Sequence, residues 1–222
     1  MKKIMFKDRF GLTEAVLSGK KTMTRRILKC PKKFKGKEDL MLEFHKRPHQ
    51  SFYYDCVVCD TDGHELGQLP LRYEIGDVVA VSQNYDRVLT ELLTYENINN
   101  EAFRNFREWN DAQCFGVWDK AGLTNKMLVR ADLMPHHVRI TDLWFERLQD
   151  ISDEDAMREG IRQSVVEYGD KKIVQWTYFG EKITTWFDSP CDAFAALINR
   201  ISGKDTWDSN PWVVAYTFEL VD

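Results

Sequence analysis

Apolar and polar residues alternate along Val138-Arg139-Ile140-Thr141-Asp142-Leu143-Trp144-Phe145-Glu146-Arg147-Leu148. This alternation predicts a long β-strand with one buried face. A short helix is expected directly after it, over residues 152–159, because Ser152 can act as N-cap and Asp155 lies three residues on. Gly160 follows as a stop signal. The other predicted elements lie before and after this strand and its capped helix in the sequence.

Further helices are predicted on either side of this unit. Residues 8–18 carry an apolar stripe that ends at Gly19, and residues 190–201 begin with Ser189 as N-cap and Pro190 at the first helical position. A polar stretch over 88–110 is also typical of a helix, with a solvated face. Shorter strands are expected at residues 3–6, 52–58, 66–69, 78–81, 127–130, 173–179, 182–186 and 212–221.

Two hairpins are predicted, one across Thr61-Asp62-Gly63 and one across Gly180-Glu181. Residues 30–50 are expected to be a mobile insertion. Strands outnumber helices and no strand–helix–strand rhythm is present, which favours an α+β fold over a doubly wound parallel sheet. We expect a curved mixed sheet that closes towards a barrel, with the three helices 8–18, 152–159 and 190–201 at its periphery.

The composition is typical of a soluble globular protein. Of the 222 residues, 43% are hydrophobic and 30% are charged, which suits one large domain. No apolar run approaches the ~20 residues that span a bilayer, and no apolar segment follows the basic N-terminus as in a secretory signal. Five cysteines at irregular spacing favour a reduced, cytoplasmic protein.

Charge is distributed unevenly along the chain. Residues 1–48 hold 15 Lys and Arg against 5 Asp and Glu, although the whole chain has a net charge of −4. This asymmetry predicts a local anion site, for which nucleic acid or a nucleotide is the first candidate. The lysine-rich stretch 32–37 alone is typical of a solvated loop. Residues 19–26, Gly-Lys-Lys-Thr-Met-Thr-Arg-Arg, follow a helix stop and indicate an anion-binding corner.

Familiar metal and catalytic motifs are absent. Cys56 and Cys59 form a CxxC pair, but no second pair completes the four ligands of a zinc site, and a strand would put the two sulfurs on opposite faces. The adjacent His136 and His137 would also point to opposite faces. The sequence has no GxSxG, no P-loop and no GxGxxG after a strand. It therefore predicts neither a metal nor a cofactor.

An ordered set of short blocks resembles the ASCH domain family of the PUA-like superfamily, in particular its larger phage- and prophage-associated members. The blocks lie at residues 4–6 with 17–19, 21–26, 73–77, 134–135, 139–141 with 146–151, 155–161 and 207–213. The resemblance implies one PUA-like domain over 1–222, with insertions at about 30–70, 86–126 and 162–188. Such members usually carry Arg and Glu where this chain has Ser82 and Gln83.

The resemblance implies two alternative functions. PUA-like domains are chiefly RNA-binding modules without chemistry, whereas a small bacterial ASCH protein is an amidohydrolase that removes the acetyl group from acetylated cytidine. The lysine, threonine and glutamate of that enzyme match Lys21, Thr24 and Glu159 here, which become the candidate catalytic residues. The resemblance implies a nucleoside or an RNA as the ligand. No membrane is expected as a partner. A compact cationic pocket on an otherwise acidic chain suits one nucleoside better than a long strand.

Four further residues are candidates for binding the substrate. Lys20, Arg25 and Arg26 belong to the basic corner, and Arg25 or Arg26 is expected at the rim of the site. Trp207 is an aromatic side chain that can stack on a base. Trp212, in contrast, is expected to pack in the turn that leads into the last core strand.

Amide hydrolysis also assigns roles to the catalytic residues. It needs a nucleophile, a base and a group that protonates the leaving amine, which are here Thr24, Lys21 and Glu159. Lys21 acts as a base only when neutral, so its pKa has to lie well below the usual ~10.4, as neighbouring cations favour. A regular strand would put Lys21 and Thr24 on opposite faces. A turn or kink is therefore needed to bring them together.

Overall fold

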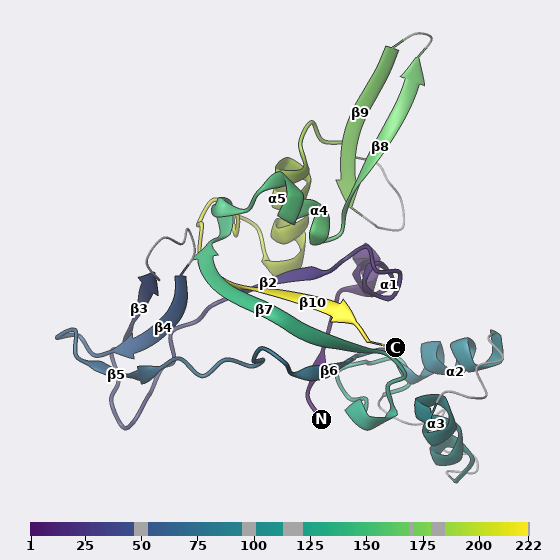
Figure 1. The fold of residues 1–222 in the computed structure, drawn as a ribbon, viewed down its shortest axis with the longest axis horizontal. Helices are drawn as coiled ribbons and strands as arrows, with labels where there is room; N and C mark the ends of the chain where they lie inside the picture. Colours follow the sequence, from purple (N-terminus) through teal and green to yellow (C-terminus); the bar gives the residue numbers. More distant parts are fainter. Residues whose placement is uncertain (47–52, 95–100, 113–121, 169–170, 179–184, 222) are drawn as a thin grey trace.

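The structure is a computed structural model that describes residues 1–46, 53–94, 101–112, 122–168, 171–178 and 185–221. Figure 1 shows a large sheet at the centre, with helices on its flanks and a two-stranded hairpin that projects from it. The sheet has eight strands and is mostly antiparallel, and the hairpin forms a sheet of its own. The expected α+β class is therefore confirmed.

The main path of the sheet follows the order β1-β6-β7-β10-β2. Its strands are β1 (Lys3–Ile4), β6 (Val78–Val81), β7 (His137–Arg147), β10 (Trp212–Leu220) and β2 (Met23–Ile27). β1 and β6 are parallel, and every other neighbouring pair on this path is antiparallel. The long strand predicted from the alternating pattern is thus the central strand β7.

A second branch of the sheet starts from β7. The strand β4 (Tyr53–Cys59) pairs with β7 through Tyr53 opposite Phe145, and it lies between β3 (Met41–Lys46) and β5 (Glu65–Gln68). The antiparallel β4–β5 pair confirms the hairpin predicted across Thr61-Asp62-Gly63. Residues 30–50, which were expected to be a mobile insertion, include β3, and β3 pairs with β4.

The sheet does not close into a barrel, which corrects the expected architecture. β1 and β2 lie at the two ends of the main path, and no pairing joins them among the described strands. β1 is only two residues long, because the chain turns after Lys7 into the 3-10 helix η1 (Asp8–Phe10). A side-chain contact replaces the missing ladder: Arg26 of β2 donates a hydrogen bond of 2.7 Å to the carbonyl of Met5.

Helices lie at the edges of the sheet (Figure 1). They are α1 (Leu12–Leu17), α2 (Tyr85–Thr94), α3 (Glu101–Ala112), α4 (Asp153–Arg158) and α5 (Pro190–Ser202), with the short 3-10 helices η2 (Ala131–Leu133) and η3 (Leu148–Asp150). The predicted caps are confirmed, since the hydroxyls of Ser152 and Ser189 accept hydrogen bonds from the backbone amides of Asp155 and Asp192.

Two helical predictions need correction. The helix expected over 8–18 is divided into η1 and α1, because Gly11 between them adopts a left-handed conformation with φ of 60°. The single helix expected over 88–110 is two helices, α2 and α3, and residues 95–100 between them lie outside the described residues. Residues 127–130 form turns rather than the predicted strand.

The second predicted hairpin falls largely outside the described residues, so it stays a prediction. The strand β9 (Lys171–Tyr178) pairs with β8 (Ile161–Tyr168), from Ile161 opposite Tyr178 to Tyr168 opposite Lys171. The expected turn at Gly180-Glu181 and most of the strand expected at 182–186 lie outside the described residues, and Trp176 forms only an isolated bridge with Phe187. The apolar residues of β8, which are Ile161, Val165, Val166 and Tyr168, do not alternate regularly with polar ones, so the sequence pattern did not predict this strand.

The main hydrophobic core lies between the sheet and the helices α1, α4 and α5. Buried residues such as Ile4, Val16, Ile140, Leu197 and Val214 belong to this one cluster. A smaller cluster joins α2 and α3 to the chain around η2. None of the helices in the described part of the chain is long and apolar enough to cross a membrane.

Candidate active site

A tight turn after α1 positions Lys21. Gly19 adopts a left-handed conformation with φ of 69°, and the amides of Lys20 and Lys21 both donate to the carbonyl of Ala15 at 2.8 Å. Lys21 therefore lies in the turn before β2 and not within the strand. This is the kink that the sequence required, and it allows Lys21 and Thr24 to line one cavity.

Glu159 reaches the same place from the opposite side. It is the C-cap residue of α4, and the carbonyl of Arg158 accepts a 3.0 Å hydrogen bond from the amide of Thr22, which ties the end of α4 to the start of β2. Gly160 follows with φ of 105°, and a Cβ at this position would lie 3.3 Å from Leu12 and 3.6 Å from Lys21. The close approach of α4 to α1 therefore depends on glycine at 160.

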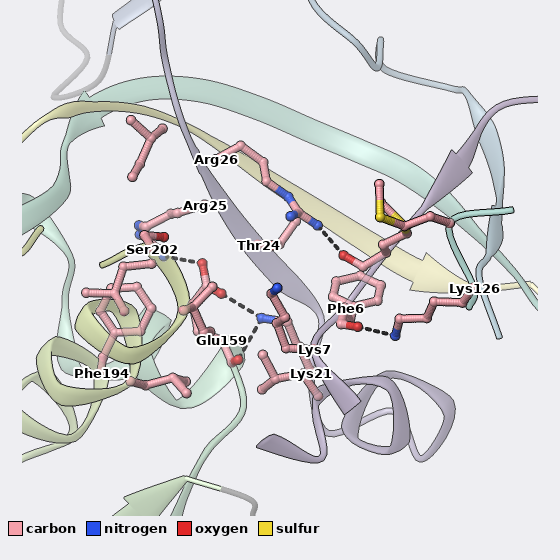
Figure 2. Close-up of a pocket in the computed structure, with 17 residues that line it drawn as sticks. Phe6, Lys7, Lys21, Thr24, Arg25, Arg26, Lys126, Glu159, Phe194 and Ser202 are labelled. Carbon is pink, nitrogen blue, oxygen red and sulfur yellow. Dashed lines mark hydrogen bonds and ion pairs between the residues drawn. The ribbon is translucent and has the colours of Figure 1, made fainter. Parts of the chain in front are cut away.

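Lys21 and Glu159 form a buried pair. The Nζ atom of Lys21 donates to Oε2 of Glu159 at 2.6 Å and to the backbone carbonyl of Glu159, also at 2.6 Å. Their side chains are only 2% and 5% exposed. Figure 2 shows both contacts, with Thr24 on the neighbouring strand. The residues expected to act together are thus in one cavity, although 138 positions separate Lys21 from Glu159.

The protonation of Lys21 reflects competing influences. Burial lowers the pKa of its ammonium group and is the largest effect, while the carboxylate of Glu159 acts to raise it. The positive charges of Arg26 and Arg25 act in the same direction as burial. The resulting pKa of Lys21 lies below the ordinary lysine value, which is the direction that a general base at neutral pH needs.

Arg25 lies in the interior and not at the rim. Its guanidinium is 1% exposed and contacts Glu146 at 2.7 Å, Asp155 at 3.1 Å and Glu159 at 3.4 Å. Glu146 in turn accepts a 2.8 Å hydrogen bond from Nε1 of Trp144. Arg25 therefore connects β2, β7 and α4 and orients the Glu159 carboxylate, so of the two arginines considered for the rim it is the interior one.

The cavity next to this pair has a volume of about 310 Å³. One wall is apolar and comes from Phe194, Leu197, Ile198 and Ile201 of α5. The rest of the lining is cationic and comes from Lys7, Lys21, Arg25, Arg26 and Lys126 (Figure 2). Among the described residues that line the cavity, Glu159 is the one acidic side chain. An electron-rich or anionic group of small size suits such a cavity.

Thr24 faces this cavity from β2. The residue is 5% exposed, and its hydroxyl makes no hydrogen bond with any group in the described ranges. Thr24 thus lines the same cavity as the Lys21–Glu159 pair, and a hydroxyl of this kind becomes a nucleophile when a base takes its proton.

The three other predicted binding residues have different positions. Arg26 is exposed, lines the cavity and donates to the Met5 carbonyl, as expected for the rim. Lys20 lines a separate open hollow with Thr22 and Arg158. Trp207 packs edge-on against Phe194, with ring centroids 6.3 Å apart, and lines no part of the cavity. The base-stacking role expected for Trp207 therefore finds no support.

Ser82 and Gln83 lie outside the cavity. They are 0% and 1% exposed, and the Gln83 side-chain amide donates to the carboxylate of Glu91 at 2.7 Å. Glu91 also accepts a 2.9 Å hydrogen bond from Arg87 one helical turn earlier on α2. A carboxylate from α2 thus approaches the position where the resemblance led us to expect one on the strand.

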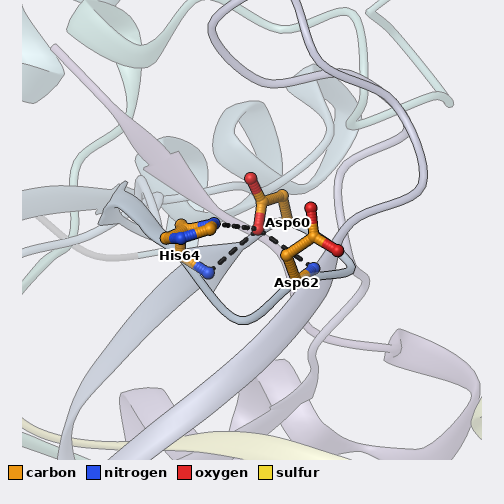
Figure 3. Close-up of side chains that lie close together, drawn as sticks. All are labelled: Asp60, Asp62 and His64. Carbon is orange, nitrogen blue, oxygen red and sulfur yellow. Dashed lines mark hydrogen bonds and ion pairs between the residues drawn. The ribbon is translucent and has the colours of Figure 1, made fainter.

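The cysteine pair and a nearby acidic turn have structural explanations. Cys56 and Cys59 are buried free thiols of β4, and burial raises the pKa of Cys56 to about 12. Asp60, Asp62 and His64 lie together in the β4–β5 turn (Figure 3). The Asp60 carboxylate accepts from the amides of Asp62 and His64, at 3.2 and 2.9 Å, and pairs with Lys37. It therefore caps the hairpin turn.

Sequence reasoning missed Lys7 and Lys126 as cavity residues and the supporting role of Glu146 and Asp155. Lys126 donates to Asp8 at 2.7 Å over a separation of 118 residues, and no local pattern signals such a contact. Glu146 and Asp155 were recognised as parts of matching blocks, but only the structure shows that both contact Arg25.

Searches with this chain against protein-family models, curated proteins and solved structures find no match.

Proposed function

We propose that this chain is an amidohydrolase of the PUA-like ASCH type that cleaves an acylated nucleoside such as acetylcytidine. One observation carries the proposal: a buried Lys21–Glu159 pair lies in the same cavity as the Thr24 hydroxyl, which has no hydrogen bond to a described group. This set supplies a base, a proton donor and a nucleophile, which are the three groups that amide hydrolysis requires.

The buried pair can exist in two protonation states of equal total charge. An ammonium facing a carboxylate becomes an amine facing a carboxylic acid when one proton moves across the 2.6 Å contact. The neutral form becomes accessible because burial penalises the charge of Lys21 and lowers its pKa. After the transfer the lone pair of the Lys21 amine points at the protonated oxygen of Glu159. Rotation about the Cε–Nζ bond turns this lone pair towards the cavity that Thr24 lines, while an N–H group of the amine still donates to the backbone carbonyl of Glu159.

Acylation then proceeds from the neutral pair. The Lys21 amine takes the proton of the Thr24 hydroxyl as Oγ1 attacks the amide carbonyl of the substrate, and a tetrahedral intermediate forms. The Glu159 carboxylic acid gives its proton to the amide nitrogen as the C–N bond breaks. The free amine leaves, Thr24 carries the acyl group as an ester, and Lys21 and Glu159 are an ion pair.

Deacylation restores the starting state. A water molecule attacks the ester carbonyl and gives a proton to the Glu159 carboxylate. The bond between the acyl carbon and Oγ1 breaks, and the Lys21 ammonium returns a proton to Thr24. One water is consumed, one carboxylic acid is released, and the neutral pair is regenerated. Arg25 keeps the Glu159 carboxylate oriented through its 3.4 Å contact during both steps.

The cavity favours a nucleoside over a peptide or a lipid. Its volume of about 310 Å³ matches a small ligand, its apolar wall on α5 can pack against a planar base, and its cations can contact electron-rich carbonyl groups. The acylated exocyclic amine of the base would lie towards Thr24, with the sugar towards the exposed Arg26.

Turnover of acetylcytidine tests the proposal directly. We expect purified protein to release cytidine and acetate, and we expect Lys21→Met and Glu159→Gln to abolish the release. Glu154→Gln is the matched control, because Glu154 is an exposed carboxylate on the same helix α4. Turnover that survives in both variants would contradict the assigned residues, and no turnover by the wild type would contradict the proposed activity on this substrate.

One observation favours the alternative of an RNA-binding module without chemistry. Lys20, Arg158 and Arg162 line a second, open hollow of about 420 Å³ that is separate from the cavity. Such a basic surface suits a phosphate backbone, whose binding weakens steeply as salt rises. Salt-sensitive binding of a short RNA in the absence of any turnover would favour this alternative.

A further inference from the structure

A smaller hollow adjoins the candidate active site and has a different chemical character. It has a volume of about 260 Å³ and lies in the gap between the ends of the open sheet. We call it the arginine groove; its lining residues are Met5, Arg26, Ile27, Leu28, Arg72, Tyr73, Val214 and Tyr216. Met5, Arg26 and Ile27 line the active-site cavity as well, so the two hollows are direct neighbours.

The two guanidinium groups of the groove lack acidic partners. Among the described residues, Arg26 and Arg72 donate hydrogen bonds only to the backbone carbonyls of Met5 and Lys3, at 2.7 and 3.4 Å, and they lie over the rings of Phe6 and Tyr73. No acidic residue lines the groove, and neither arginine forms an ion pair with a carboxylate in the described part of the chain. Each guanidinium has five N–H donors, so most of them are available to a ligand.

Two tyrosines add a polar floor to the groove. Tyr216 is only 2% exposed, and its hydroxyl donates no hydrogen bond to a described group. Burial raises the pKa of Tyr216 to about 12, so this hydroxyl stays protonated and remains a donor at neutral pH. Tyr73 packs edge-on against it with ring centroids 5.5 Å apart, and its own hydroxyl donates to the Lys3 carbonyl at 2.8 Å.

We propose that the arginine groove binds a phosphate monoester of the substrate, so that the enzyme acts on an acylated nucleoside 5′-monophosphate in preference to the free nucleoside. The guanidinium fork matches phosphate oxygens in a bidentate way, and a buried tyrosine hydroxyl donates a further hydrogen bond. Two arginines in a hollow of this size suit one phosphate group. The identity of the acylated part rests on the proposed function, whereas the anion site rests on the groove alone.

Binding experiments test the groove without any turnover. Calorimetry with cytidine and with cytidine 5′-monophosphate is expected to show at least tenfold tighter binding of the monophosphate by the wild type. Arg72→Gln removes a groove cation that does not line the active-site cavity, and we expect it to reduce this preference to threefold or less. Arg104→Gln, an exposed arginine on α3, is the matched control and should keep the full preference.

Inorganic phosphate separates a general anion site from a nucleotide site. We expect it to compete with the monophosphate in the wild type and in Arg104→Gln, and to compete at least fivefold less effectively in Arg72→Gln. Equal binding of cytidine and its monophosphate by the wild type would overturn the groove proposal. An unchanged preference in Arg72→Gln would overturn it as well, provided that thermal unfolding shows a folded variant.

Turnover then distinguishes failure of the groove from failure of the proposed function. We expect acetylcytidine 5′-monophosphate to be cleaved with a kcat/KM at least tenfold above that of acetylcytidine, and Arg72→Gln to lower this ratio through KM. Equal cleavage of both compounds would overturn the groove proposal and leave the amidohydrolase intact. Cleavage of neither, combined with Arg72-dependent binding of the monophosphate, would overturn the proposed activity and support the groove.

Discussion

The Nζ atom of Lys21 contacts both the carboxylate and the backbone carbonyl of Glu159, each at 2.6 Å. The first contact depends on the side chain at 159, and the second depends only on the position of the chain at the end of α4. Lys21 therefore links α4 to β2 in addition to any role in chemistry. A substitution at either residue has structural and catalytic consequences, and experiments have to separate them.

A double-mutant cycle measures how strongly the pair is coupled. Glu159→Gln leaves Lys21 buried without its counter-charge, so we expect it to lower the free energy of unfolding by about 3 kcal/mol. Lys21→Met should destabilise as well, and the double variant should cost about 1–3 kcal/mol less than the sum of the two. Urea unfolding gives these values. Glu154→Gln should stay within about 0.5 kcal/mol of the wild type, and simple additivity would show that the two groups are not coupled.

Local signals predicted the central unit of the fold. The alternating pattern of β7 was recognised because that strand has one buried face, and the capped starts of α4 and α5 were recognised because Ser152 and Ser189 are N-caps. The pairing of Lys21 with Glu159 was reached through a resemblance and not through physics, since no local rule connects the end of α4 to the turn before β2. Its geometry in the structure is therefore an independent observation.

Long-range packing decided what the sequence did not reveal. Arg25 and Arg26 were both candidates for the rim, because an arginine in a basic stretch is normally solvated, and the sequence does not show that Arg25 is the buried one. Its burial depends on Glu146 from β7 and Asp155 from α4, which offset the cost of removing its charge from water. Closure of the barrel likewise depends on backbone hydrogen bonds between the short strand β1 and β2. The Arg26 side chain instead donates a hydrogen bond to the Met5 carbonyl, between these two strands.

Substitutions at Thr24 separate the nucleophile from the fold. Thr24→Ser keeps a hydroxyl in the cavity, so we expect it to retain turnover of acetylcytidine, whereas Thr24→Ala should lose about 10³-fold or more in kcat. Both variants should unfold within about 1 kcal/mol of the wild type, because the hydroxyl has no hydrogen bond to a described group. Steady-state kinetics and urea unfolding check this. Full activity in Thr24→Ala would mean that water attacks the substrate directly.

The carboxylate of Asp60 provides a pH marker remote from the site. Its hydrogen bonds with Lys37 and with the backbone of His64 lower its pKa to about 2. Because the folded pKa lies below the unfolded value, the stabilisation is complete above about pH 4 and is lost as the pH falls towards 2. An NMR titration of the carboxyl carbon should show this low midpoint. Asp60→Asn should flatten the acid dependence of stability between pH 4 and 2, and a midpoint near 4 would mean that the turn contacts are absent in solution.

The pH dependence of stability reports on Lys21 itself. Burial lowers the pKa of Lys21 in the folded protein, while the unfolded chain has the ordinary value of about 10.4. Between these two values the unfolded state binds more protons, so the contribution of Lys21 to the free energy of unfolding rises as the pH rises towards 10.4. The difference in unfolding free energy between the wild type and Lys21→Met, measured in urea from pH 7 to pH 10, should therefore increase with pH. The active pair in the proposed mechanism holds one proton, so kcat/KM for acetylcytidine should fall once the pH exceeds the lowered pKa at which the pair loses that proton, well below pH 10.4. A stability difference that stays flat or falls over this range would mean that the Lys21–Glu159 pair keeps its one proton up to pH 10, which would contradict the lowered pKa of Lys21.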